Sequence, residues 1–123
     1  MKYMLLIYSD GQGYAAASEA EQAELMGEYF AFTKAIVDSK EHVAGDPLQG
    51  IETATTVRVR NGDVLATDGP FTETKEVLGG YYIVDVPDLD RATELAGQLP
   101  GARRGWDSIE VRPLMELPAD FPH

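Results

Sequence analysis

The first apolar segment of the chain runs without a break from residue 3 to residue 8. A strand with one face in solvent would alternate apolar and polar positions, and this segment does not. We therefore predict a strand that is buried on both of its faces.

A long amphipathic helix is predicted over residues 18–40, after a turn that contains Gly11 and Gly13. Ser18 and Glu21 have the spacing of a capping box, and acidic residues suit the first turn of a helix. Apolar side chains and one threonine recur at helical spacing and predict the buried face, which comprises Met26, Tyr29, Phe30, Thr33, Ile36 and Val37.

A β-hairpin is predicted in the middle of the chain. Residues 42–48 have a weak pattern that indicates a short strand or a loop, whereas residues 55–60 alternate as a strand does. Asn61 and Gly62 follow, the preferred pair for a two-residue hairpin turn, and the returning strand covers residues 64–67.

Three elements complete the pattern: a strand over residues 81–86, a helix that ends at Pro100, and a last strand that ends near Leu117. The predicted apolar face of that helix comprises Leu89, Ala92, Leu95, Ala96 and Leu99.

This order of elements predicts a ferredoxin-like α+β domain. The two crossover helices must lie on the same face of a mostly antiparallel sheet. With no internal repeat and no linker, we expect one domain over residues 1–117 and a loose tail over residues 118–123.

Two helices can cover only one face of such a sheet, yet the first strand and residues 81–84 are apolar on both faces. We expect a second copy of the chain to cover the other face, since most soluble oligomers are symmetric homo-oligomers. The alternative is that this face is a ligand cleft or a partly exposed surface.

Composition argues against several classes of function. The formal net charge of −11 over 123 residues argues against nucleic acid as a partner, which clustered Lys and Arg would bind. The chain has no cysteine, so it lacks disulfides, a thiolate nucleophile and Cys-ligated zinc, and we expect no metal and no cofactor. The first apolar run is too short for a signal peptide or a membrane span, which predicts a cytoplasmic protein without membrane association.

The most distinctive segment begins with Asp68, Gly69, Pro70 and Phe71. It continues with Glu73-Thr74-Lys75-Glu76 and with Gly79-Gly80-Tyr81-Tyr82. In these residues, and in its first strand, hairpin and last strand, the sequence resembles the YCII-related proteins of the DGPF subgroup.

The resemblance implies a ferredoxin-like fold that pairs as a dimeric α+β barrel with a cleft as the active site. A His and an Asp have been proposed as the catalytic pair of the wider family. The Asp corresponds to Asp68, whereas no His transfers, because His42 matches no family motif. Genes of the subgroup often lie beside those of extracytoplasmic-function sigma factors, which suggests an indirect regulatory link.

Asp68 has two interpretations that remain open. A carboxylate on a rigid Gly-Pro turn beside a cleft could act as a general base or anchor a ligand, if burial raised its pKa. An aspartate in this position also commonly caps a turn by accepting backbone N–H groups.

Several other side chains are candidate ligand contacts. Lys75, with Glu73 and Glu76, could line a polar pocket and hold an anion, or it could belong to a solvated loop. Arg58 and Arg60 share a strand face, and Arg112 could join them in an anion-binding cluster. The alternative is that these arginines pair with acidic residues across strands.

Three tyrosines, Tyr8, Tyr81 and Tyr82, could donate hydroxyl groups to a ligand or pack in a sheet interface. Two functions therefore stay open. One is binding, or transformation, of a small polar or anionic molecule near Asp68. The other is a non-catalytic regulatory module associated with a sigma factor.

Overall fold

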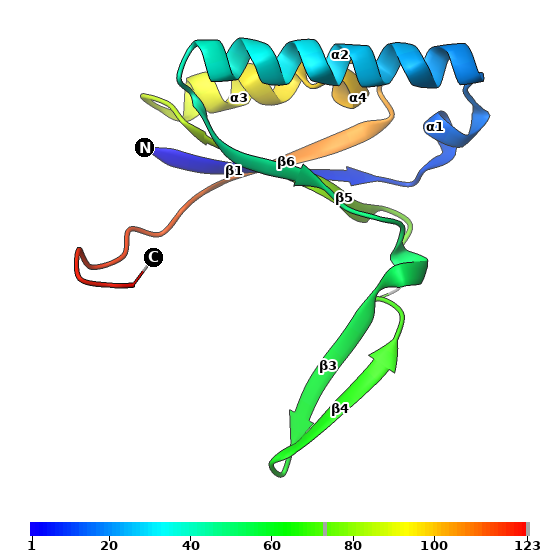
Figure 1. The fold of residues 1–123 in the computed structure, drawn as a ribbon, viewed down its shortest axis with the longest axis vertical. Helices are drawn as coiled ribbons and strands as arrows, with labels where there is room; N and C mark the ends of the chain where they lie inside the picture. The colour runs from blue at the N-terminus through cyan, green and yellow to red at the C-terminus, as the bar shows by residue number, and fades with distance from the viewer. Residues whose placement is uncertain (73, 123) are drawn as a thin grey trace.

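A four-stranded antiparallel sheet lies at the centre of the computed structural model, which describes residues 1–72 and 74–122. Its strand order is β2-β5-β1-β6. The strands are β1 (Lys2–Ser9), β2 (His42–Pro47), β5 (Val77–Asp85) and β6 (Asp107–Pro113). The helices α2 (Glu19–Asp38), α3 (Leu89–Gln98) and α4 (Pro100–Arg103) cover one face of the sheet, as Figure 1 shows. This is the predicted ferredoxin-like α+β arrangement.

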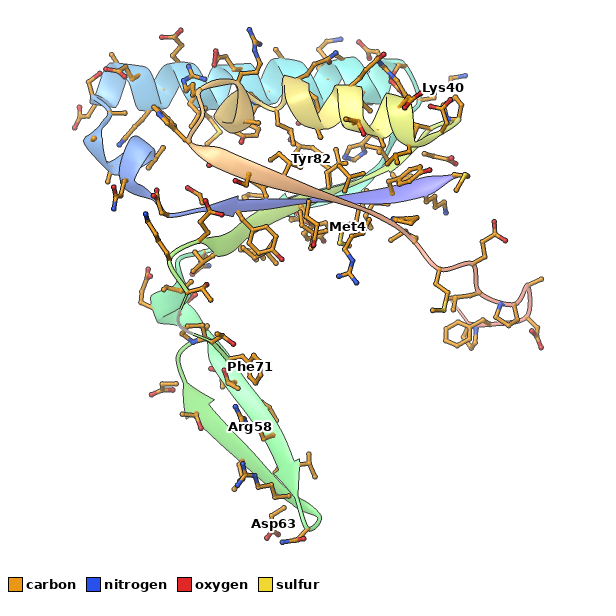
Figure 2. All side chains as sticks on the ribbon, turned by 180° about the vertical axis from the view of Figure 1, so that it is seen from behind. Met4, Lys40, Arg58, Asp63, Phe71 and Tyr82 are labelled. Atoms are coloured by element: carbon orange, nitrogen blue, oxygen red, sulfur yellow. The ribbon has the colours of Figure 1, made fainter. Side chains whose placement is uncertain are left out.

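The central strand β1 pairs with β5 on one side and β6 on the other. Tyr3 and Leu5 are buried beneath the helices, whereas Met4 and Leu6 point to the opposite side and are only half-buried. Figure 2 shows Met4 and Tyr82 on opposite sides of the sheet. We call the side without helices the open face; its residues on β1, β5 and β6 are Met4, Leu6, Tyr8, Tyr81, Ile83, Glu110 and Arg112.

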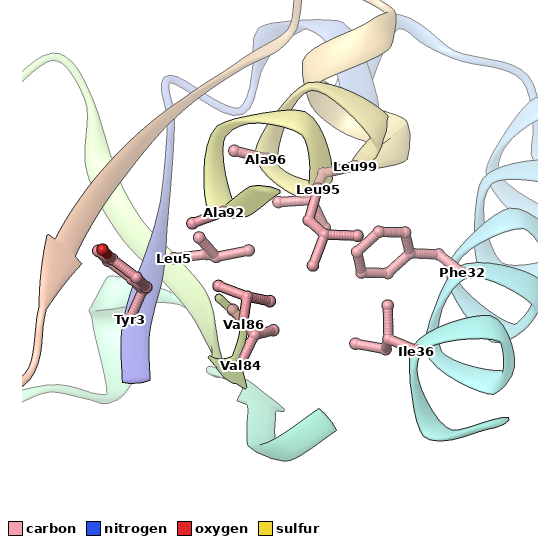
Figure 3. Close-up of a cluster of buried hydrophobic side chains, with 10 residues drawn as sticks. All are labelled: Tyr3, Leu5, Phe32, Ile36, Val84, Val86, Ala92, Leu95, Ala96 and Leu99. Atoms are coloured by element: carbon pink, nitrogen blue, oxygen red, sulfur yellow. The ribbon is translucent and has the colours of Figure 1, made fainter. Parts of the chain in front are cut away.

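The hydrophobic core lies between the sheet and the helices (Figure 3). Leu5 and Val84 contribute from the sheet, and Leu95 and Leu99 from α3 and its end, each with 0% or 1% of its surface exposed. Phe32 of α2 closes the cluster on the other side. Burying each of these side chains contributes about 1.5–3 kcal/mol, so this cluster is the main source of stability.

Helix α2 confirms the predicted capping box, because the Ser18 hydroxyl accepts a hydrogen bond from the backbone N–H of Glu21. Part of its predicted buried face is wrong. Met26, Phe30 and Val37 are exposed, and Leu25 and Phe32 are buried in their place. The helix carries two adjacent apolar stripes rotated by about 100° from one another, and the sheet can bury only one of them.

The sequence pattern also missed two short elements, α1 (Gln12–Ala16) and the 3-10 helix η1 (Ile51–Thr53). Gly13 of α1 packs directly under an aromatic ring, since a Cβ at this position would lie 2.3 Å from Cγ of Trp106. Such short turns depend on tertiary contacts more than on any periodic pattern. Two strand boundaries also differ from the predicted ones. Strand β5 begins at Val77, before the predicted start at residue 81, and β6 ends at Pro113, before the predicted end near Leu117.

Strands β3 (Thr55–Arg60) and β4 (Asp63–Asp68) form the predicted hairpin as a separate two-stranded sheet. Asn61 and Gly62 both have positive φ, 50° and 82°, as the predicted turn requires. We call this hairpin the arm; it projects from the side of the sheet opposite the helices (Figure 1). No helix in the described part of the chain is long and apolar enough to cross a membrane.

Two leucines of α3 test the location of the core. Leu95 is 1% exposed, and Leu89, on the same helix, is 53% exposed. Leu95→Ala should lower the free energy of unfolding by about 2–5 kcal/mol through lost burial and a cavity. Leu89→Ala should change it by less than about 1 kcal/mol. Urea unfolding followed by circular dichroism measures both, and equal losses would contradict the assigned core.

Candidate functional site

A groove of about 560 Å³ lies at the base of the arm, where β1 ends and β5 begins. Its lining is mainly apolar: Tyr8, Leu48, Ile51, Ala54, Pro70, Phe71, Val77 and Leu78. Polar groups on the same walls come from Gln49, Thr53, Thr72, Thr74 and Glu76. A concave apolar lining with a few polar groups is typical of a small-molecule site.

Tyr8 connects this groove with the open face. It opposes Leu78 of β5, which also lines the groove, and the bulged residue Gly79 of β5 lies next to this pair. Bulges re-aim side chains at sheet edges and next to functional sites. Of the three predicted tyrosines, Tyr8 is the one that the structure places in the groove lining.

The predicted motif forms the junction between the arm and the groove. The backbone N–H of Gly69 donates to the carbonyl of Ala54, and the hydroxyl of Thr56 donates to the carbonyl of Gly69 at 2.8 Å. Gly69 has a φ of 101°, which a residue with a Cβ rarely adopts. The glycine of the motif therefore allows the chain to leave β4 and enter the groove wall at Pro70.

Asp68, the last residue of β4, is exposed and does not line the groove. Among the described residues, no group donates a hydrogen bond to its carboxylate. The structure thus offers no bond of the kind expected for a turn cap, and it does not bury the carboxylate as the general-base interpretation required.

Arg58 lies beside the motif. Its guanidinium carbon is 5.1 Å from the centroid of the Phe71 ring, in a cation–π contact. Figure 2 shows Arg58 on the arm and Phe71 nearer the base of the arm. Because Phe71 lines the groove, this contact places a cation next to an aromatic wall.

The remaining predicted cations do not gather around Arg58. Arg112 lies on the open face opposite Met4, in a different sheet from the arm, so the expected cluster with Arg58 and Arg60 does not form within one chain. The predicted cross-strand ion pairs of these arginines are also not observed within the described residues.

In the charged part of the motif, Glu76 lines the groove, whereas Lys75 is exposed and is not part of the lining. Glu73 lies outside the described residues. Of the two residues of this predicted pocket that the structure describes, Glu76 lines the groove and Lys75 does not.

The two tyrosines of β5 lie on opposite faces. Tyr81 is on the open face, and its hydroxyl lies 3.5 Å from Oδ2 of Asp46. Tyr82 lies under α2, where its hydroxyl is 2.6 Å from that of Thr33 and its ring contacts Phe32 and His42. Tyr82 is thus part of the interface between sheet and helix, and neither Tyr81 nor Tyr82 belongs to the groove lining.

Asp107, at the start of β6, was not singled out by sequence reasoning. Burial raises the pKa of its carboxyl group; hydrogen bonds from Ser9 and Tyr29 oppose that shift, and the nearby charges of Asp10 and Glu76 add to it. Burial, together with the charge of Asp107, also raises the pKa of Tyr29 to about 12. No periodic pattern marks Asp107, because its neighbours come from distant parts of the chain.

No group of three or more His, Cys, Asp or Glu residues suited to a metal ion occurs within residues 1–72 and 74–122.

Residues 1–118 match the profile of the YCII-related domain. The chain belongs to the YCII-related family. One relative is an uncharacterised protein of Rhizobium meliloti (strain 1021), 34% identical over 123 residues, with 99% of each chain covered.

The fold of this YCII-related protein also resembles that of a solved structure. The structure is 5-chloro-2-hydroxyhydroquinone dehydrochlorinase (TftG) from Burkholderia phenoliruptrix AC1100, in complex with 2,5-dihydroxybenzoquinone. The TM-score is 0.51, the sequences are 14% identical, and 94% of each chain is covered. At this identity the likeness shows a common fold.

The raised pKa of Asp107 predicts how stability depends on pH. Its ionised form destabilises the folded state above the folded-state pKa, and this cost disappears as pH falls below about 3.8, the unfolded value. Asp107→Asn removes the cost, so the stability of the variant relative to wild type should rise between about pH 3 and pH 7. Thermal melts of both proteins across this range measure the difference, and a pH-independent difference would contradict the assigned burial.

Proposed function

We propose that this YCII-related protein binds a small polar or anionic molecule in the groove at the base of the arm. The observation that carries the proposal is the groove itself, where two aromatic walls, Tyr8 and Phe71, meet a short set of polar groups. The guanidinium of Arg58 over Phe71 supplies a positive charge at its rim.

The chemistry of these groups favours a planar ligand with an anionic or carbonyl oxygen. The aromatic rings of Tyr8 and Phe71 offer faces for stacking, and Arg58 can donate two parallel hydrogen bonds to such oxygens. The related fold of TftG holds a small quinone in its own complex, which agrees with a ligand of this size. Any chemical transformation would need a proton acceptor, for which Asp68 and Glu76 are the candidates, and Lys75 could hold an anion only if the loop moved toward the groove.

We also propose a homodimer, as a dimeric α+β barrel, with the open face as its interface. Met4, Leu6, Tyr81 and Ile83 give this face an apolar centre that the helices of the same chain cannot reach. Sheets pack face to face at about 10 Å, so a second copy would bury these side chains. Arg112 and Tyr81 would then lie inside the dimer, on the same face of the sheet as Tyr8, which lines the groove.

The motif at residues 68–71 supports membership in the DGPF subgroup. The indirect link to a sigma factor and the cytoplasmic location remain predictions from the sequence. No feature of the described residues favours the regulatory module over ligand binding.

The cation and the aromatic ring beside the groove give the first test of the site. We expect a planar probe such as 2,5-dihydroxybenzoquinone or benzoate to bind the wild-type protein, and Arg58→Gln and Phe71→Ala to weaken binding at least tenfold.

If Asp68 takes part, Asp68→Asn should abolish binding while leaving the melting temperature nearly unchanged, because only the charge and basicity are lost. If Asp68 takes no part, affinity should persist, and Asp68→Ala should change the free energy of unfolding by less than about 1 kcal/mol, because this exposed carboxylate accepts no hydrogen bond within the described residues.

Glu76→Gln makes the same change at the carboxylate that lines the groove and should change the affinity for the probe, whereas Asp68 lies outside the lining. Isothermal titration and thermal melting measure both variants. Failure of Arg58→Gln and Phe71→Ala to change the affinity for any bound probe would contradict the groove as the binding site.

The dimer has its own test. Light scattering after size exclusion at micromolar concentration should give twice the 13.4 kDa chain mass. Leu6→Lys places a charge at the centre of the open face and should give a monomer, whereas Leu89→Lys, on exposed α3, should leave the dimer intact. A monomeric wild-type protein would refute the dimer.

A further inference from the structure

The arm has an apolar side that nothing in the described chain covers. Val57 and Val59 of β3 lie opposite Ala66 and Val64 of β4, so all four point to one side. Val59 and Val64 are 65% and 69% exposed. A two-stranded hairpin is only marginally stable by itself in water, so such an arm needs a further packing partner.

The outer edge of β3 is also free. Within the described residues, β3 pairs with β4 alone, which leaves its other row of backbone N–H and C=O groups without a strand. Open edges of this kind are templates for an added strand.

The tail of the chain has the matching properties. The backbone N–H of Leu114 donates to the carbonyl of Lys2, and the chain then leaves the sheet. Within the described residues, the N–H groups of Met115, Glu116 and Leu117 have no backbone acceptor. Met115 is 85% exposed.

The two segments match position by position. Side chains alternate along an extended chain, so Met115 and Leu117 point to one side and Glu116 to the other. In β3 the same alternation places Val57 and Val59 on one side and the arginines on the other. A tail paired with β3 therefore sets apolar side chains beside apolar side chains and Glu116 beside Arg58 and Arg60.

Charge distinguishes the two edges of the arm. Strand β3 carries Arg58 and Arg60 and no acidic residue, whereas β4 carries Asp63 and Asp68 and no basic residue. Opposite charges on facing strands stabilise a pair, and like charges destabilise it. An acidic tail thus suits the edge of β3 and is repelled by the edge of β4.

The tail that fills this edge must come from a second copy. The arm and the tail both project from the open side of the sheet but at its opposite ends, as Figures 1 and 2 show. In a face-to-face dimer, a two-fold axis that runs across the strands exchanges these ends and brings each arm beside the tail of its partner. Six residues of β3 extend about 20 Å at about 3.3 Å each, longer than the separation of about 10 Å between stacked sheets.

We infer that residues 115–117 of one chain add as a third strand to the outer edge of β3 in a second copy, and that the exchange is reciprocal. This inference rests on the proposed dimer. The contact would hold the arm in place beside the groove, so each tail would also stabilise the neighbouring site.

Cross-linking tests the contact directly, because the chain has no cysteine of its own. Val59→Cys and Met115→Cys chains with different tags are mixed and treated with a short bismaleimide. We expect a cross-linked heterodimer from this mixture. Val59→Cys mixed with Leu89→Cys is the matched control, since Leu89 is exposed on α3, on the other side of the sheet. Equal yields in both mixtures would overturn the inference.

Charge reversal tests the pairing. Glu116→Arg should weaken the dimer at least several-fold in dilution measurements, and combining it with Arg58→Glu should recover much of the loss. Asp120→Arg makes the same charge change in the same tail beyond the paired segment, and should have a much smaller effect. Loss without recovery in the double variant would contradict the pairing.

The outcomes separate this inference from the proposed dimer. A dimer by light scattering that gives no Val59–Met115 cross-link overturns the strand exchange and leaves the open-face dimer standing. Cross-linking of Val59→Cys to itself in place of Met115→Cys would show two arms in contact and would also overturn it. A monomer overturns both.

Discussion

The two-sided character of strand β1 is the constraint on which the rest of the structure depends. Tyr3 and Leu5 build the core with the helices, and Met4 and Leu6 extend an equally apolar surface on the other side. The helices follow crossovers of one hand and can cover only the first of these sides. The open face follows from this connectivity, and no element within the described residues covers it.

The groove forms at the end of β1, where the regular pairing of the sheet stops. A bulge at Gly79 of β5 interrupts the register beside Tyr8, the chain between β2 and β5 departs to form the arm, and Gly69 returns it with a backbone angle that suits glycine. Each step is local, but together they leave a hollow between the sheet and the arm. The groove therefore belongs to the junction, where the packing of the sheet is interrupted.

Electrostatics gives the arm and the groove their character within an acidic chain. Arg58 stacks on Phe71 at the groove, and no acidic side chain on β3 neutralises it. Elsewhere, arginines pair with carboxylates: Arg91 binds Glu41 through two nitrogens and holds α3 to the start of β2. The arginines that stay unpaired within the described chain are the ones available to a ligand or a second copy.

Periodicity and turn chemistry in the sequence determined the core layers, the capped helix and the Asn-Gly hairpin, because these depend on interactions between residues a few positions apart. Two residues of the motif, Pro70 and Phe71, line the groove. Only the tertiary structure decided which stripe of α2 is buried, that Tyr82 faces the helices while Tyr8 reaches the groove, and that Arg112 lies far from Arg58 in the fold. Asp107 was missed for the same reason. Its environment comes from Ser9 and Tyr29, and contacts between residues so distant in sequence leave no periodic signal.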